Sequence, residues 1–93
     1  MIRSYRDKRT EGLANGVPPR GVPLDFAKRA VNKLFLLDTV TRLEDLRVPP
    51  GNRLEALSGS RSGQHSIRVN DQWRLCFVWR DGDVHDAEFV DYH

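Results

Sequence analysis

The stretch "HSIRVNDQWRLCFVW", from His65 to Trp79, decides the fold because hydrophobic and polar residues alternate along both of its halves. Ile67 and Val69 share one face of the first half, while the second half places four large residues on one face: Trp73, Leu75, Phe77 and Trp79. A period of two residues predicts two β-strands. The intervening "NDQ" is short enough for a hairpin, so the strands are expected to pair antiparallel.

A third strand is predicted after this pair. "RDGD", residues 80–83, contains an Asp-Gly dipeptide of the kind that forms tight hairpin turns, and "VHDAEFV", residues 84–90, again reads as a strand. The C-terminal half therefore predicts an antiparallel meander.

The N-terminal half predicts helices. "MIRSYR" alternates weakly like a strand, "DKRTEGLANG" fits a short helix beginning near Asp7, and "GVPPRGVP" breaks regular structure. Pro23 suits the first position of an amphipathic helix that runs to about Asp38, with apolar residues spaced by three and four: Leu24, Ala27, Val31, Leu34 and Leu37. The segment from Thr41 to Leu46 fits one further helical turn.

These elements predict an α+β fold, a small antiparallel sheet with two to three helices packed on one face. The length of 93 residues allows one domain, spanning 1–93, with no internal repeat. The uncovered sheet face would carry Arg68, Arg74 and Arg80. Like charges side by side on paired strands require either an anionic partner or neighbouring acids, for which Glu88 and Asp86 are candidates.

Composition narrows the class of protein. The apolar runs "LFLL" and "LCFVW" are far shorter than the roughly 18 residues of a membrane span, so we expect a cytoplasmic chain without membrane attachment. Cys76 is the single cysteine, which excludes an internal disulfide and a thiolate metal cluster. His65, His85 and His93 match no metal-site spacing, and we expect neither a metal nor another cofactor.

Charge is distributed unevenly along the chain. Residues 1–33 contain eight Lys or Arg and three acids, residues 53–80 contain five Arg and two acids, and residues 81–93 contain five acids without Lys or Arg. Clustered cations favour a polyanion partner such as nucleic acid. With a net charge of +2, a solvated surface explains the pattern equally well.

The chain closes on "EFVDYH", residues 88–93. A predicted strand there is followed directly by a carboxylate, a phenol and an imidazole. These groups are either the polar end of a last strand or part of a catalytic site. An imidazole beside a carboxylate suits general acid or base catalysis near neutral pH.

Several of these motifs occur together in one family. "MIRSYRDK", "GVP" before the long helix, the block "RLEAL" through "SIRVNDQWR", and the final "DYH" together resemble the HigB toxins, the plasmid-maintenance or killer-protein branch of the RelE-like superfamily. The resemblance covers nearly the whole chain and implies the RelE-like α+β fold.

The resemblance also implies a function. Such toxins are endoribonucleases that cut messenger RNA in the ribosomal A site, without a metal, when the 2′-hydroxyl of the RNA attacks the adjacent phosphate. A HigA-like helix-turn-helix antitoxin silences them, and operator DNA is bound only through that antitoxin.

Residue roles follow from matching positions. The resemblance assigns catalysis to the C-terminal Asp91, Tyr92 and His93, with Arg74 on the phosphate, and suggests Glu55 as a general base. The remaining basic residues are expected to bind RNA: Arg53, Arg61 and Arg68 near the site, and Lys28, Arg29 and Lys33 on the helix face, where they are either simply solvated or in contact with ribosomal RNA.

One departure weakens the match. Some relatives carry a histidine where "RLEAL" offers Glu55, and a basic residue near the position of Ser58. A glutamate can act as a base but cannot bring positive charge to a phosphate. A catalytically weak or inert member that binds RNA, or an antitoxin–operator complex, through the same basic face is therefore the alternative.

Overall fold

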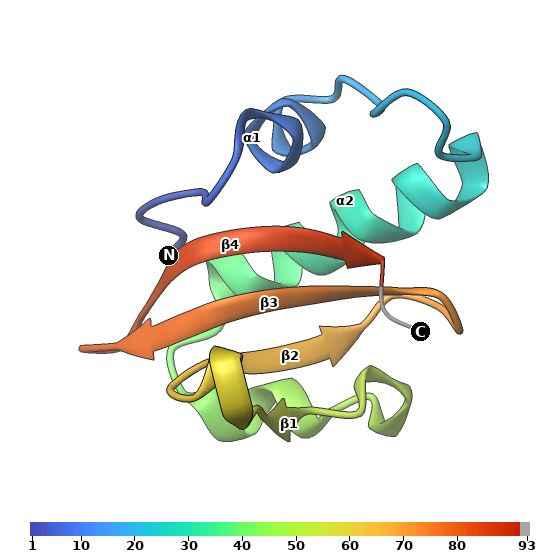
Figure 1. Cartoon of the computed structure of the whole chain (residues 1–93). Helices are drawn as coiled ribbons and strands as arrows, with labels where there is room; N and C mark the ends of the chain where they lie inside the picture. The colour runs from blue at the N-terminus through green and yellow to red at the C-terminus, as the bar shows by residue number, and fades with distance from the viewer. Residues whose placement is uncertain (92–93) are drawn as a thin grey trace.

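The computed structural model describes residues 1–91 and has a two-layer α+β architecture (Figure 1). Four antiparallel strands lie in the order β1-β2-β3-β4: β1 (Glu55–Ala56), β2 (His65–Arg68), β3 (Trp73–Arg80) and β4 (Asp83–Asp91). Helices α1 (Lys8–Ala14) and α2 (Leu24–Thr39) pack against one face of this sheet. The fold expected from the sequence is therefore confirmed.

Local chemistry fixes two of the hairpin turns. Asp81 and Gly82, between β3 and β4, both have positive φ, as the predicted Asp-Gly turn requires. Between β2 and β3, Asn70 Oδ1 accepts hydrogen bonds from the backbone N–H groups of Gln72 and Trp73, both at 2.8 Å. A short polar side chain thus closes the second turn.

The core lies between the sheet and the helices. Helix α2 contributes Ala27, Ala30, Leu34 and Leu37, while the strands contribute Ile67, Leu75, Phe77 and Phe89, all buried. Leu24, expected on the apolar side of this helix, is 57% exposed. Helix α2 begins one residue after Pro23, which occupies the N-cap position instead of the first turn.

Helix α1 is tied to the last strand. Asp7 caps the helix by accepting from the Thr10 backbone N–H at 2.8 Å, and Thr10 Oγ1 accepts from the Phe89 backbone N–H at 2.9 Å. The N-terminal segment, expected as a weak strand, forms two isolated parallel bridges to β4 instead, at Ile2 and Tyr5.

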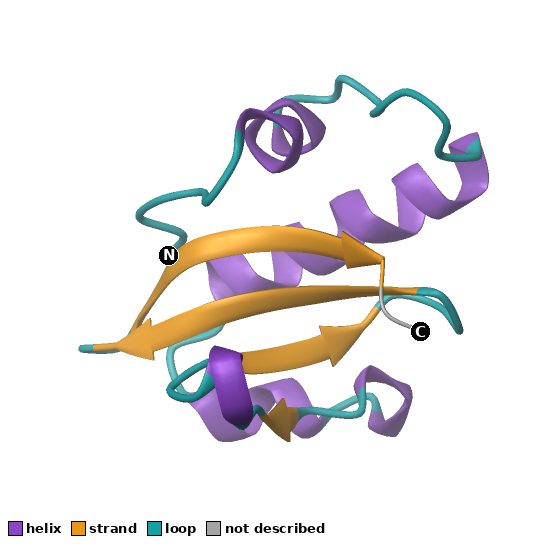
Figure 2. Cartoon of the chain, viewed as in Figure 1, coloured by secondary structure: helices purple, strands orange, loops and turns teal. Residues whose placement is uncertain are grey.

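The second face of the sheet carries only short elements. Figure 2 shows the 3-10 turn η3 (Gly59–Arg61) in front of the strands and helix α2 behind them. Two further 3-10 turns, η1 (Leu43–Arg47) and η2 (Pro50–Asn52), connect α2 to β1. Within residues 1–91, no helix is long and apolar enough to cross a membrane. The face without α-helices, called here the open face, is where the predicted arginines lie.

Candidate active site

Four of the predicted site residues line one hollow on the open face. The hollow has a volume of about 380 Å³ and lies where β1 and β2 meet the β2–β3 turn. Its lining consists of Arg53, Glu55, Arg68, Asn70, Asp71 and Arg74. We refer to it as the arginine hollow, because three of its six residues are arginines.

Arg74 is held in the arginine hollow by burial and by hydrogen bonds of its guanidinium group. Its side chain is buried, with 9% exposure. Arg74 Nε donates to Ser66 Oγ at 2.8 Å, and Nη2 donates to the carbonyl oxygen of Arg53 at 2.6 Å. A guanidinium fixed by its own hydrogen bonds is preorganised for an anion, because little side-chain entropy remains to be lost on binding.

Arg68 lies directly opposite Arg74 in the register of β2 and β3. It forms an ion pair with Asp71, whose side chain is 98% exposed. Two cations at one register position repel each other unless an anion lies between or beside them. Asp71 supplies part of that negative charge in the free protein.

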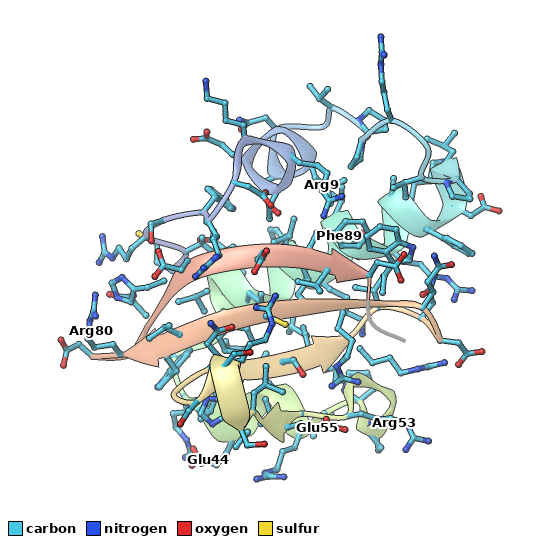
Figure 3. All side chains as sticks on the ribbon, viewed as in Figure 1. Arg9, Glu44, Arg53, Glu55, Arg80 and Phe89 are labelled. Atoms are coloured by element: carbon cyan, nitrogen blue, oxygen red, sulfur yellow. The ribbon has the colours of Figure 1, made fainter. Side chains whose placement is uncertain are left out.

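Glu55 lies on β1 and Arg53 lies just before it (Figure 3), and both line the arginine hollow. Glu55 pairs with Ser66 across β1 and β2, and it is exposed. Its carboxylate is therefore accessible from solvent at the rim of the arginine hollow. Arg53 adopts the left-handed conformation, with φ 46°, which is uncommon for a residue with a long side chain. Its carbonyl oxygen thereby reaches Arg74.

Arg61 lies outside the arginine hollow. Its Nη1 is 3.0 Å from Glu88 Oε1, and Arg6 Nε lies 3.8 Å from the same oxygen. Glu88 therefore neutralises Arg61, which is not one of the three arginines, Arg68, Arg74 and Arg80, for which acids on the last strand were suggested. Asp86, the second candidate acid, instead accepts a hydrogen bond from Ser4 Oγ at 3.3 Å.

The three basic residues of helix α2 do not form one patch. Lys33 donates to Asn52 Oδ1, and partial burial lowers the pKa of its ammonium group. Lys28 lines a hollow between α1 and α2. Arg29 lines a hollow beside the β2–β3 turn, which it shares with Arg68. Of the three, only Arg29 lies next to the arginine hollow.

Asp91 is the last described residue of the predicted C-terminal group, while Tyr92 and His93 lie outside the described residues. It ends β4 and pairs with Trp73, one position from Arg74. Because side chains alternate along a strand, Asp91 is directed to the face of Trp73 and away from that of Arg74. Gln72 Nε2 donates to Asp91 Oδ2 at 3.1 Å.

Two residues near the site were not singled out from the sequence. Asn70 lines the arginine hollow and closes the β2–β3 turn. The position of Asn70 at the start of the predicted turn could have indicated its role in that turn.

The second of these residues is Arg9, on α1. Its guanidinium carbon lies 5.5 Å from the Trp73 ring and 5.8 Å from the Phe89 ring, and its guanidinium group donates a hydrogen bond to the Phe89 carbonyl (Figure 3). It anchors β4 two residues before Asp91. No local sequence pattern indicates the contacts of Arg9 with β3 and β4.

The arginine hollow offers a distinct set of chemical groups. Three guanidinium groups can balance the charge of a phosphate, and a carboxylate on the rim can accept a proton. The other titratable groups expected in catalysis belong to the end of β4 and the residues beyond it. This combination suits binding of a phosphodiester at the strand ends.

Comparison with known proteins identifies the family. A family model described as the RelE-like toxin of the type II toxin–antitoxin system HigB matches residues 4–93. The chain is 48% identical to "Toxin HigB-1" of Vibrio cholerae serotype O1 over 83 residues, which is 88% of this chain and 87% of that protein. It is 32% identical over 93 residues to "Endoribonuclease HigB" of Proteus vulgaris, covering both chains completely.

Solved structures support the same fold. A mutant of YafQ from E. coli has a TM-score of 0.64 at 18% identity, covering 98% of this chain and 91% of that one. The YoeB–YefM complex from Staphylococcus aureus has a TM-score of 0.55 at 17% identity, covering 100% and 98%. At these identities the likeness concerns the fold alone, while the family model and the two sequence relatives show that this chain belongs to the HigB family of RelE-like type II toxins.

Proposed function

We propose that this toxin is a ribosome-dependent mRNA endonuclease of the cytoplasm. The observation that carries the proposal is the arginine hollow, where Arg53, Arg68 and Arg74 converge on a space large enough for part of a nucleotide. The Proteus vulgaris relative, aligned over the whole chain, is named an endoribonuclease. A cluster of cations on the open face of a small sheet suits the phosphate backbone of single-stranded RNA.

The reaction we propose is internal transesterification. The 2′-oxygen forms a bond to the adjacent phosphorus while the bond to the 5′-oxygen breaks, giving a 2′,3′-cyclic phosphate and a free 5′-hydroxyl. One group removes the 2′-hydroxyl proton and another protonates the departing oxygen. The nucleophile belongs to the RNA itself, and the proposed mechanism assigns no step to a metal ion.

Each step has a candidate residue. Arg74 stabilises the additional negative charge on the phosphate, because its bonds to Ser66 and Arg53 hold it in place. Glu55 accepts the 2′-hydroxyl proton from the rim of the arginine hollow. His93 protonates the 5′-oxygen, and Tyr92 orients the scissile nucleotide by hydrogen bonding or stacking. Asp91, whose side chain faces away from that of Arg74, would support His93 as a neighbouring carboxylate from outside the arginine hollow.

The proposed partners follow from the family. Solved relatives include the DinJ–YafQ and YoeB–YefM toxin–antitoxin complexes. We propose that a HigA-like helix-turn-helix antitoxin binds this chain and silences it, and that operator DNA is contacted through that antitoxin. The ribosome would present the mRNA of its A site to the open face.

Cleavage of a defined mRNA on purified ribosomes tests the proposal. A 5′-labelled message with an occupied P site should be cut within the A-site codon, leaving a 2′,3′-cyclic phosphate. Replacing the nucleotide before the cut by its 2′-deoxy analogue should abolish that product. Cleavage of the deoxy message at the same position would contradict the mechanism.

A binding module without catalytic activity is the second candidate, and the exposure of Glu55 favours it. An exposed carboxylate lacks the water-excluded surroundings in which catalytic groups act most strongly, and some relatives have a histidine at this place. On this reading the chain would bind programmed ribosomes without cutting the message. The same ribosome assay separates the two functions, because binding and cleavage are measured on one sample.

A further inference from the structure

Two hollows meet at the β2–β3 turn. Beside the arginine hollow lies a second one of about 270 Å³, lined by Phe26, Arg29, Arg68, Asn70, Asp71 and Gln72. Arg68, Asn70 and Asp71 line both of them. An RNA strand that crosses the arginine hollow can therefore continue toward helix α2 past these three shared residues.

Asn70 at this junction carries an unused hydrogen-bond donor. The residue is only 8% exposed, and its Oδ1 accepts from two backbone N–H groups of the turn. Those bonds fix which end of the amide is oxygen, so the NH₂ group is held in one direction. Asn70 Nδ2 is buried and has no hydrogen-bond partner among residues 1–91. A buried donor without a partner costs about 1–3 kcal/mol, which a bound acceptor would recover.

We propose that Asn70 Nδ2, Arg68 and Arg29 form a second phosphate subsite, adjacent to the phosphate that Arg74 holds. Arg29 and Arg68 line the same hollow as Asn70, so the acceptor that fits is an anion. In an RNA chain that anion is the neighbouring phosphodiester. The inference rests on the proposed function, because it assigns the second hollow to the same RNA strand.

Asp71 occupies part of this subsite in the free protein. Its carboxylate pairs with Arg68, and with a side chain that is 98% exposed it can leave without disturbing the fold. An exposed ion pair contributes about 0.2–1 kcal/mol, so a phosphate can replace the carboxylate at little cost. When RNA binds, its phosphate would replace the Asp71 carboxylate at Arg68, and the same phosphate would accept a hydrogen bond from Asn70 Nδ2.

The test measures binding without chemistry. The probe is a short, labelled RNA in which every 2′-hydroxyl is methylated, so that it cannot be cleaved by 2′-oxygen attack. Asn70→Asp keeps an oxygen to close the turn but removes the donor, and it should weaken binding by about tenfold or more. Asp71→Asn frees Arg68 and should tighten binding by about three- to fivefold.

A double variant separates the donor from net charge. Asn70→Asp combined with Asp71→Asn exchanges the amide and the carboxylate between neighbouring positions, so the formal charge equals that of the wild type. Its binding should remain weaker than wild type. Arg29→Gln should also weaken binding and lower the slope of log affinity against log salt by about 0.7. Lys8→Gln, which removes one positive charge in a different hollow, should change neither.

Three outcomes decide the matter. Equal affinity of the wild type and the double variant would overturn the subsite while leaving the proposed cleavage intact. Absence of salt-dependent binding by the wild type at low salt would also overturn the subsite, while the proposed cleavage is decided separately on ribosomes, which position the message. The expected affinities together with no cleavage on ribosomes would support the subsite and reject the nuclease. Thermal unfolding of each variant confirms that the turn still forms.

Discussion

Arg68 on β2 and Arg74 on β3 lie directly opposite each other in the sheet. The two cations are held in different ways. Arg74 is buried and bonded to Ser66 and to the Arg53 carbonyl, while Arg68 is paired with the exposed Asp71. The protein thus fixes one guanidinium and leaves the other to exchange partners, which is the division expected of a site that positions one phosphate and admits a second.

Replacement of the two arginines should affect stability differently. Arg74→Gln leaves Ser66 Oγ and the Arg53 carbonyl without their donor, so the free energy of unfolding should fall by about 1–3 kcal/mol. Arg68→Gln removes an exposed ion pair and a like-charge contact, so it should change the free energy of unfolding by less than about 1 kcal/mol. Urea denaturation measures both. Equal losses in the two variants would contradict the assignment of Arg74 as the anchored residue.

Glu55→Gln tests the general base. Removing the carboxylate should slow cleavage on ribosomes by about 10²–10⁴-fold, while RNA affinity stays level or rises because a negative charge has left the arginine hollow. Glu44→Gln is the matched control, since Glu44 is also exposed but lies on η1, outside the hollow (Figure 3). Unchanged cleavage in both variants would show that Glu55 does not accept the proton.

Arg9→Met tests the anchoring of β4. Methionine retains an apolar stem against Trp73 and Phe89 but loses the cation above their rings, which lie stacked with centroids 4.3 Å apart. The free energy of unfolding should fall by about 1 kcal/mol. Hydrogen exchange at the end of β4 should accelerate as well. A variant with wild-type exchange there would mean that Arg9 does not secure this strand.

Asp83 should make stability depend on pH. A hydrogen bond from Arg3 is the main cause that lowers the pKa of this carboxyl below its ordinary value of 3.8. A folded pKa below the unfolded one adds stability above the unfolded value, and this stability is lost as pH falls through the folded value. Melting temperatures between about pH 6 and about pH 3 should therefore fall less steeply for Asp83→Asn than for the wild type. Parallel curves would refute this role.

The sequence was most informative where a local pattern governs structure. β3 begins at Trp73 and ends at Arg80, as its alternation indicated, because a half-buried strand must repeat every two residues. The Asp81-Gly82 turn formed for an equally local reason. β1 was not predicted, since two residues carry no period and this strand exists only through pairing with Ser66 and His65.

The sequence predicted most of the residues that line the arginine hollow, but it did not predict which residues contact one another. Arg53, Glu55, Arg68 and Arg74 all came from residues singled out in the sequence, and they line one hollow. The separation of Arg61 from them depends on Glu88, 27 residues away, which no local spacing reveals. The NH₂ group of Asn70, which has no hydrogen-bond partner within residues 1–91, likewise cannot be recognised until the structure shows that the turn uses its oxygen.

The most direct test of the central claim is primer extension on translated messages in bacteria that express either the wild type or the Tyr92→Phe, His93→Ala double variant. At equal protein levels, the wild type should produce cuts within codons and the double variant should produce none. Identical cuts from both proteins would contradict catalysis by the C-terminal residues. Growth arrest by the wild type without any cuts would contradict the nuclease itself.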